Sequence, residues 1–354
     1  MSLQFSYVTN PTHVFFGKGS ASRAAEAADI LGCKRLLVLA TPQQKAMAEE
    51  LACRLGDLCL GVYAKAKMHT PVKVTTAAMR VIEEQKVDGV VSLGGGSTIG
   101  LGKAIAYRTG LPQIAIPTTY AGSEVTPILG QTENNTKTTL RSSKVVPEVV
   151  IYDPTFTRSL PQAMSITSGI NAIAHAVEAL YAEDRNPVSS MMAAEGANAL
   201  IDALPLIAKD GADDQAREKA LYGCWLCGTV LGNVGMALHH KLCHTLGGLF
   251  NLPHAETHTV ILPHATAYNY QSVPDQLAPL CAALDTDSPG EGLFKFARKL
   301  GAPTSLRELG MDEEGIDLAT DQAMANPYWN PRRLDHREIR KLIENAYFGH
   351  RPGG

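Results

Sequence analysis

An apolar run that ends in consecutive glycines and continues as a helical pattern constrains the fold of this chain most. The run VDGVVSL (residues 87–93) leads into the turn residues Gly94, Gly95, Gly96 and Ser97, and a helical stretch follows. Glycines let the backbone turn sharply, and the free N–H groups at the start of a helix attract phosphate. The segment therefore predicts a pyrophosphate-binding turn, with a tight turn of purely structural purpose as the alternative.

The alternation of strand and helix patterns extends over the first 150 residues. The predicted elements are a strand at 35–40, a helix at 46–58, a strand at 59–66, a helix at 72–87, a strand at 87–96, a helix at 98–110 and a strand at 113–119. The polar segment that follows predicts a hairpin and a last strand ending near Asp153. Such alternation is typical of a parallel sheet covered by helices, a Rossmann-like α/β domain.

The amino-acid composition of the sequence changes near Leu160. From there the chain is rich in Ala, Leu, Met and Glu and has few β-branched runs, which favours helices. Prolines between Pro154 and Pro161 would end regular structure at the boundary. We expect an α/β dinucleotide-binding domain at residues 1–157 and an all-α substrate domain at residues 158–354.

Composition narrows the class of protein and its partners. With 45% hydrophobic residues, 19% charged residues and a net charge of -3, the chain matches a globular enzyme and lacks the basic clusters that nucleic-acid binding needs. We find no signal-peptide pattern and no long apolar run, so we expect a cytoplasmic protein without a membrane partner. Seven irregularly spaced cysteines indicate reduced thiols, and the pair Cys224 and Cys227 lacks the second pair of a zinc site.

Further candidates for cofactor binding lie near the predicted ends of strands. Lys103 follows the glycine turn by two helical turns, where it could reach the ribose or nicotinamide of a dinucleotide. Hydroxyl side chains in the segment PTTYAGSEVT suit phosphate or ribose contacts, although some would only satisfy turns: Thr118, Thr119, Ser123 and Thr126. Thr41 follows the strand at 35–40 without a nearby carboxylate to repel a 2′-phosphate, so both NADH and NADPH are expected.

Histidines gather in one short stretch of the second half. Five of the eleven histidines lie there: His239, His240, His244, His254 and His258. Earlier, Asn171 and His175 are four residues apart, a spacing that places two side chains on one helical face. Imidazoles suit both metal binding and proton transfer, so the cluster predicts a functional site in preference to a set of core histidines.

Taken together, these motifs carry a family resemblance. The segments GGGSTIGLGKAIA, PTTYAGSEVT, HKLCHTLGGLFNLPHA and NPYWNPRR, with Asn171 and His175, resemble the iron-containing alcohol dehydrogenase family over nearly the whole chain. The resemblance implies a dehydroquinate synthase-like fold, a nicotinamide cofactor and a homodimer. It also implies that the aspartate and three histidines that bind metal in that family fall on Asn171, His175, His240 and His254, and its pocket histidine on His244.

The chain departs from the family pattern in three places. Asn171 offers a neutral amide where the family has a carboxylate, which weakens the affinity for a divalent metal. Gly100 stands where the family usually has an acidic residue, and PTTYAGSE is one residue shorter than usual. These features resemble the family branch that reduces 2-maleylacetate to 3-oxoadipate during the breakdown of aromatic compounds, and they imply a pocket without metal.

The resemblance also implies roles for individual residues. His244 is the first choice as proton donor and His254 the second. An enolate would be stabilised by hydrogen bonds from Asn171, His175, His240 and His254. Partners for a dicarboxylate substrate are expected in Tyr120, Lys241, Tyr328 and Arg332, with Trp329 nearby. The alternatives are a metal-dependent alcohol or polyol dehydrogenase of the same fold and a non-enzymatic nucleotide-binding regulator. The clustered histidines disfavour the regulator.

Overall fold

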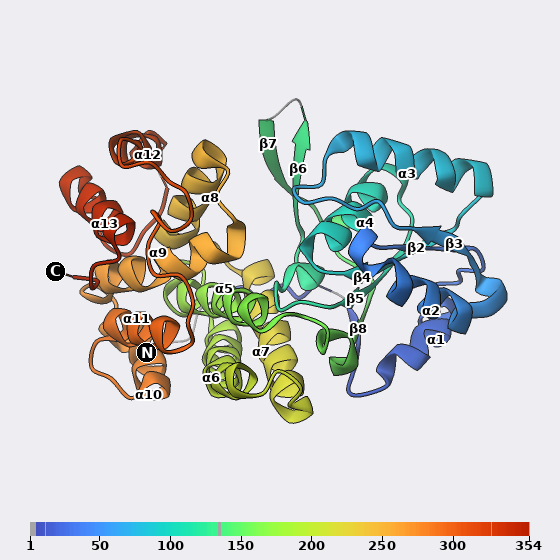
Figure 1. Cartoon of the computed structure of the whole chain (residues 1–354), viewed down its shortest axis with the longest axis horizontal. Helices are drawn as coiled ribbons and strands as arrows, with labels where there is room; N and C mark the ends of the chain where they lie inside the picture. Colours follow the sequence, from blue (N-terminus) through green and yellow to red (C-terminus); the bar gives the residue numbers. More distant parts are fainter. Residues whose placement is uncertain (1–4, 11, 134–135, 327, 354) are drawn as a thin grey trace. The chain divides into compact units, whose positions relative to one another are not determined.

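A six-stranded parallel sheet organises the first of two compact units in the computed structural model (Figure 1). The structure describes residues 5–10, 12–133, 136–326 and 328–353. The sheet order is β1-β8-β5-β4-β2-β3, with β1 (His13–Phe16), β2 (Leu36–Leu39), β3 (Cys59–Tyr63), β4 (Gly89–Gly94), β5 (Gln113–Pro117) and β8 (Val149–Tyr152). Every neighbouring pair is parallel, so all six strands end at the same edge.

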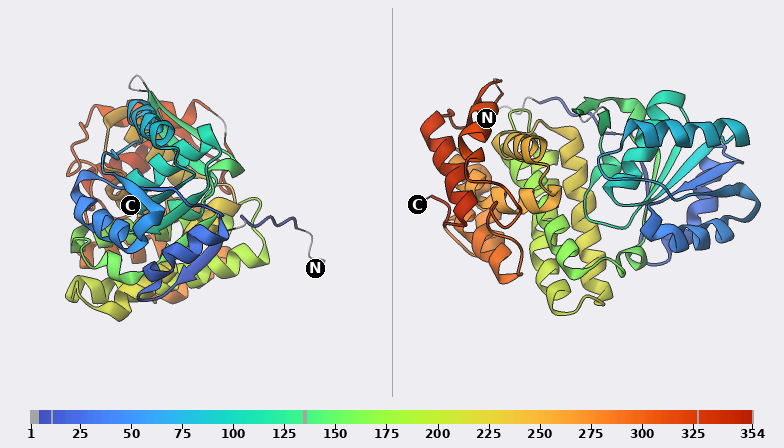
Figure 2. Two further views of the ribbon diagram at one scale, coloured as in Figure 1. Left: turned by 90° about the vertical axis from the view of Figure 1, so that its right-hand side faces the viewer. Right: turned by 45° about the horizontal axis from the view of Figure 1, so that its top comes forward.

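Helices cover both faces of this sheet, as Figures 1 and 2 show. They are α1 (Ala24–Ile30), α2 (Lys45–Leu55), α3 (Val72–Gln85) and α4 (Gly96–Thr109). Leu36 and Val38 of β2 pack in the core with α1 and α2, whereas Leu37 and Leu39 pack with α3 and α4. Because successive side chains on a strand point to opposite faces, a strand buried on both faces has a continuous apolar sequence.

Two further elements complete the α/β unit. The polar segment predicted to form a hairpin contains the antiparallel pair β6 (Ile128–Glu133) and β7 (Thr136–Arg141). The strand β1 was not among the predicted elements, and it pairs with β8 at the edge of the sheet. The rest of the predicted order of strands and helices is confirmed.

The second unit is helical. Its helices are α5 (Gln162–Tyr181), α6 (Pro187–Lys209), α7 (Asp214–Asn233), α8 (Leu238–Phe250), α9 (His254–Tyr270), α10 (Pro274–Leu284), α11 (Pro289–Lys299), α12 (Gly315–Met324) and α13 (His336–Phe348). The helix α5 is buried along nearly its whole length and packs against α6, α7 and α9. By length and hydropathy α6 could cross a membrane, but half of its most apolar window is buried among neighbouring helices.

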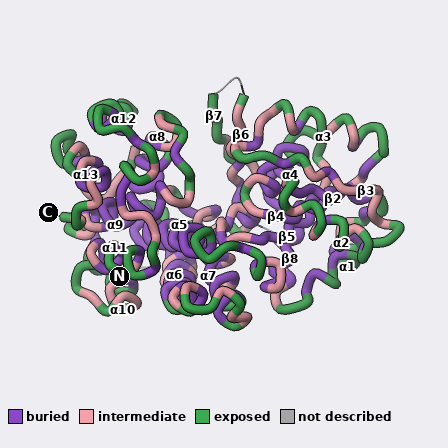
Figure 3. The backbone as a smooth tube through the Cα atoms, viewed as in Figure 1, coloured by how far each residue is buried: buried purple, intermediate pink, exposed green. Residues whose placement is uncertain are grey.

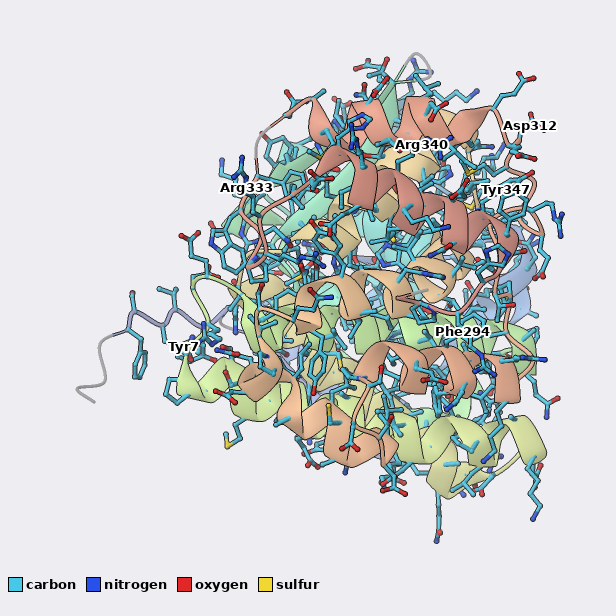
Figure 4. All side chains as sticks on the ribbon, turned by 90° about the vertical axis from the view of Figure 1, so that its left-hand side faces the viewer. Tyr7, Phe294, Asp312, Arg333, Arg340 and Tyr347 are labelled. Atoms are coloured by element: carbon cyan, nitrogen blue, oxygen red, sulfur yellow. The ribbon has the colours of Figure 1, made fainter. Side chains whose placement is uncertain are left out.

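Outer helices of this unit are amphipathic. Figure 4 shows Arg340 and Tyr347 on α13. The Arg340 guanidinium pairs with Asp317 at 2.6 Å, whereas Tyr347 is buried in the core. Figure 3 shows the same alternation along the chain, because buried and exposed residues follow one another within the outer helices.

The two units divide near the predicted boundary. The α/β unit spans Val8–Leu160, and the helical unit spans Pro161–Gly354 together with a short N-terminal stretch ending at Tyr7. The predicted boundary region, between Pro154 and Pro161, contains this division. The sequence did not predict that the chain start would group with the helical unit, where the Tyr7 hydroxyl accepts a hydrogen bond from Asn233.

Candidate functional site

The glycine turn in the α/β unit leaves room for a ligand beside the start of α4. A Cβ atom on Gly94 would lie 2.8 Å from Oε1 of Gln44, and one on Gly95 would lie 2.7 Å from Cγ2 of Thr119. Gly96, the first residue of α4, has no atom within 4 Å of its Cβ position. The turn therefore needs small residues at Gly94 and Gly95 for its own packing, and at Gly96 it exposes a helix N-terminus suited to phosphate.

Hydroxyl groups near the same edge are linked by a residue that the sequence did not single out. Gln44, in the short 3-10 helix after β2, donates a hydrogen bond from Nε2 to the hydroxyl of Thr118 at 2.6 Å. Its Oε1 accepts a hydrogen bond from the hydroxyl of Thr41 at 3.1 Å. The amide thus joins the residues after β2 to those after β5, and two predicted cofactor contacts, Thr41 and Thr118, meet in one network.

Lys103 has a different role from the predicted cofactor contact. Its side chain is fully buried, and its ammonium donates to the carbonyl oxygens of Ser123 at 2.5 Å, Thr126 at 2.7 Å and Ile128 at 2.9 Å. Burial lowers the pKa of Lys103 to about 7, against the opposing attraction of Glu124. The lysine therefore fixes the segment after β5, including Ser123, and its ammonium faces protein oxygens.

Two of the predicted substrate contacts, Tyr120 and Arg332, also make polar contacts with other residues of the protein. Tyr120 is completely buried, and its hydroxyl donates to Thr157 at 3.5 Å. Arg332 donates to the carbonyl oxygen of Tyr268 at 3.1 Å and pairs with Glu338 at 2.6 Å. Both side chains therefore already have partners within the protein, and their role as substrate contacts stays a prediction.

The other two candidates lie together in the helical unit. The Lys241 ammonium is 5.5 Å from the ring centroid of Tyr328, within the range of a cation–π contact. The Tyr328 hydroxyl is buried without a hydrogen-bond partner among the described residues, and burial raises the pKa of this phenol. Trp329, the residue after Tyr328, is exposed. Among the predicted substrate contacts, the Tyr328 hydroxyl is thus a buried polar atom without a hydrogen-bond partner in the described part of the chain.

A directional chain of hydrogen bonds joins the helices α5 and α8. Nδ2 of Asn171 lies 3.4 Å from Nε2 of His175, Nδ1 of His175 lies 2.9 Å from Nε2 of His240, and Nδ1 of His240 lies 2.7 Å from Glu178. An amide nitrogen can only donate and a carboxylate can only accept. The two ends therefore assign Nδ1–H to both histidines, and every bond in the chain points toward Glu178.

Glu178 is the anchor of this chain, and the sequence analysis missed it. Its carboxylate also accepts hydrogen bonds from the backbone N–H groups of Ala237, His239 and His240 at the start of α8, at 2.9, 2.8 and 3.4 Å. Burial acts to raise the pKa of Glu178, but the hydrogen bonds from His240 and these amides outweigh it and hold the pKa below its usual value. The signal was present, because Glu178 lies three residues after His175 on the same helix.

The remaining histidines form two layers. His239 and His258 are fully buried, and Nε2 of His239 lies 2.9 Å from Nδ1 of His258. His244 and His254 are exposed, with ring centroids 6.5 and 4.3 Å from that of His258. Burial lowers the pKa of both His239 and His258 well below the usual value, so these two rings are neutral. The structure thus brings the predicted catalytic residues together and adds His239 and His258 to them.

The residues at the family's metal positions do not fit a divalent cation. The Asn171 amide supplies no negative charge, and the Nε2 lone pair of His240 accepts the hydrogen bond from His175. The described residues contain one group of His, Cys, Asp and Glu ligand atoms within 4.8 Å of one another, and it comprises His239, Cys243 and His258. The family's metal chemistry therefore has no matching donor set at Asn171, His175, His240 and His254.

Comparison with known proteins places the chain in a family. A family model described as iron-containing alcohol dehydrogenase matches residues 11–154, and one described as Fe-containing alcohol dehydrogenase family, C-terminal, matches residues 165–347. Maleylacetate reductase of Rhizobium sp. (strain MTP-10005) is 60% identical over 98% of this chain and 99% of its own length. Maleylacetate reductase of Sphingobium indicum is 52% identical over 98% of both.

A solved structure agrees with these sequence matches. The crystal structure of maleylacetate reductase from Agrobacterium tumefaciens has a TM-score of 0.97 and 57% identity, and it covers 99% of this chain and 100% of that chain. Both the sequence and the fold therefore match along the full length, in the α/β unit as in the helical unit. The chain belongs to the iron-containing alcohol dehydrogenase family.

Proposed function

We propose that this enzyme reduces 2-maleylacetate to 3-oxoadipate with NADH or NADPH, as a step in the breakdown of aromatic compounds, and that it does so without a metal ion. The similarity to maleylacetate reductases over the whole chain supports the substrate. The observation that carries the metal-free mechanism is the hydrogen-bond chain from Asn171 to Glu178, which uses the lone pair of His240 that a metal would need.

The reaction adds a hydride to an electron-poor carbon of a C=C bond conjugated to a carbonyl, and a proton to the neighbouring carbon. A nicotinamide held beside Gly94, Gly95, Gly96 and Ser97 supplies the hydride when it is bound. Hydride addition leaves an enolate, whose negative oxygen needs hydrogen-bond donors. Nδ1–H of His175 and Nδ1–H of His240 already donate within the chain that ends at Glu178. In this proposal the donors therefore come from the other histidines and from the Tyr328 hydroxyl, which is buried and has no hydrogen-bond partner among the described residues.

His244 is the proton donor in this proposal. Its ring is exposed, so solvent can return the proton after each turnover, and His254 is the second candidate for the same reason. The proposal also assigns cofactor binding to residues 1–157 and substrate binding to residues 158–354. It includes a homodimer in the cytoplasm that has no nucleic-acid or membrane partner.

The test of the proposed function is a cofactor-oxidation assay with maleylacetate, with and without a chelator. We expect turnover with both nicotinamide cofactors and no loss on chelation. Activity that chelation abolishes and iron or zinc restores would refute the metal-free mechanism and favour a metal-dependent dehydrogenase. Failure to oxidise NADH or NADPH with any unsaturated or carbonyl substrate would favour the nucleotide-binding regulator.

Replacing His244 by alanine tests the assigned proton donor. Loss of general acid catalysis should lower kcat by about a hundredfold, while the affinity for NADH measured by fluorescence stays within about twofold. His244 is exposed, so the substitution should not lower the melting temperature. An unchanged kcat would exclude His244 and direct the same experiment to His254.

A further inference from the structure

His258 stands at the centre of the histidine cluster, yet neither the sequence motifs nor the family's metal positions give it a role. Its ring centroid lies 4.3 Å from that of His254, 5.0 Å from His240 and 6.2 Å from His175. The side chain is 0% exposed, and its Nε2 atom has no hydrogen-bond partner within the described part of the chain. A buried nitrogen without a partner costs about 1–3 kcal/mol, so some state of the protein should satisfy it.

The other nitrogen of the same ring is fixed. Nδ1 of His258 lies 2.9 Å from Nε2 of His239, so one hydrogen lies between the two nitrogens, and Sγ of Cys243 lies 3.7 Å from Nε2 and 4.0 Å from Nδ1 of His239. Burial raises the pKa of the Cys243 thiol well above its usual value, so the thiol keeps its hydrogen and can donate it. A thiol that donates to Nδ1 of His239 leaves the hydrogen of that ring on Nε2, from which it donates to Nδ1 of His258, and the single N–H of the neutral His258 ring is then on Nε2.

The proposed substrate fits a hydrogen-bond donor at Nε2 of His258. Maleylacetate at neutral pH has two carboxylates and a carbonyl, so it offers acceptors and no donor. We propose that Nε2–H of His258 donates a hydrogen bond to an oxygen of the bound substrate, and that His239 and Cys243 are positioning residues that keep the hydrogen on that nitrogen. This inference rests on the proposed function, because it takes its acceptor from the dicarboxylate substrate.

Two exposed histidines lie beside this donor. His244 and His254 pack beside His258 and are themselves exposed, and exposed side chains change rotamer within nanoseconds. In this inference, a movement of one of these rings lets the substrate reach Nε2 of His258. The substrate would then meet a proton donor, His244, and a hydrogen-bond donor, His258, close to each other.

Two amide substitutions separate the two nitrogens of His258. In His258→Gln the side-chain amide reaches the place of Nε2, whereas in His258→Asn it reaches only the place of Nδ1 and can keep the contact with His239. We expect His258→Asn to lose kcat/KM for maleylacetate by roughly 10- to 100-fold, as for other donors to a developing oxyanion, and His258→Gln to recover most of it. NADH affinity, measured by fluorescence, should be unchanged in both variants.

His264 provides the matched control. It is a second buried histidine of α9 whose Nε2 has no partner in the described chain, but it packs against Phe294 outside the cluster. His264→Asn removes the same atoms from the same helix, so it should leave kcat/KM unchanged at pH 7.5. An equal loss in His264→Asn and His258→Asn would show that the effect comes from the fold of α9 and would overturn the inference.

The outcomes distinguish this inference from the function on which it rests. No turnover of maleylacetate by the wild type would refute the proposed function. Normal turnover by the wild type and by His258→Asn would refute the role of His258 alone. Stoichiometric zinc in the purified protein that is lost in Cys243→Ala would also overturn the inference, because a metal would then occupy the nitrogens of His239 and His258.

Discussion

The site in the α/β unit and the site in the helical unit are built from different parts of the chain. The first consists mainly of backbone, with glycines and a helix N-terminus at residues 94–97. The second consists of side chains, six histidines and an asparagine ordered by one buried carboxylate. A backbone site tolerates many changes among its neighbours, whereas a side-chain network fails when its charged end is removed. The following predictions test this contrast.

Glu178→Gln should have the largest effect. The amide keeps one oxygen, so its NH2 group would face part of the backbone N–H groups that now donate to the carboxylate and would leave those without an acceptor. A buried group left without its hydrogen-bond partner costs about 1–3 kcal/mol, and more for a partner of a charged group, so we expect the free energy of unfolding of the helical unit to fall by about 3 kcal/mol. Calorimetry measures the loss, and kcat should fall with it.

If the backbone site of the α/β unit does not depend on the side-chain site of the helical unit, the folded fraction of Glu178→Gln should still bind NADH. Glu183→Gln is the matched control, because Glu183 is exposed just beyond the end of α5. It should change neither stability nor kcat. Equal stability of Glu178→Gln and the wild type would show that the carboxylate does not order the cluster.

The local patterns explain which parts of the fold could be predicted. The predicted helix at 72–87 is Val72–Gln85, and the predicted strand at 35–40 is Leu36–Leu39, because periodicity and glycine turns are local signals. The strand β1 was missed because His13–Phe16 becomes a strand by pairing with β8, whose residues lie far along the chain.

The same distinction applies to the sites. The glycine turn was predictable because the strand, turn and helix are contiguous. The part played by Glu178 was not, because the groups that donate to its carboxylate lie about sixty residues away at the start of α8, and its spacing from His175 alone does not reveal them. Lys103 illustrates the same limit, since its four acceptor atoms belong to a loop that folds back onto α4.

Acid should weaken the helical unit through its buried neutral imidazoles, and His264 isolates this effect. Burial, with a smaller effect of His350, lowers the pKa of His264 to about 4, whereas the unfolded chain has a value near 6.5. Between these pH values the unfolded chain binds the proton and the folded chain does not, so stability falls as the pH falls from 6.5 toward 4.

The lowered pKa of His264 predicts that this residue accounts for a loss of about 2 kcal/mol in the free energy of unfolding between pH 7 and pH 5. Denaturant unfolding of the wild type and His264→Asn at the two pH values measures it. The variant is expected to be less stable at pH 7 but to lose less on acidification. Parallel pH profiles of the two proteins would mean that His264 is protonated in the folded state.

Gly96→Ala should have the smallest effect, and it probes the backbone site directly. No atom lies within 4 Å of the Cβ position, and alanine favours a helix over glycine by about 0.5–1 kcal/mol, so the melting temperature without cofactor should hold or rise. A pyrophosphate against the N-terminus of α4 would meet the new methyl group, which should raise the Kd for NADH roughly tenfold, or about 1.4 kcal/mol. Gly95→Ala behaves differently, because its Cβ would press on Thr119 at 2.7 Å and lower the melting temperature even without cofactor. A melting temperature that holds or rises, together with weaker NADH binding in Gly96→Ala, would show that the phosphate lies against the backbone of this turn. Unchanged NADH affinity would show that the phosphate lies elsewhere.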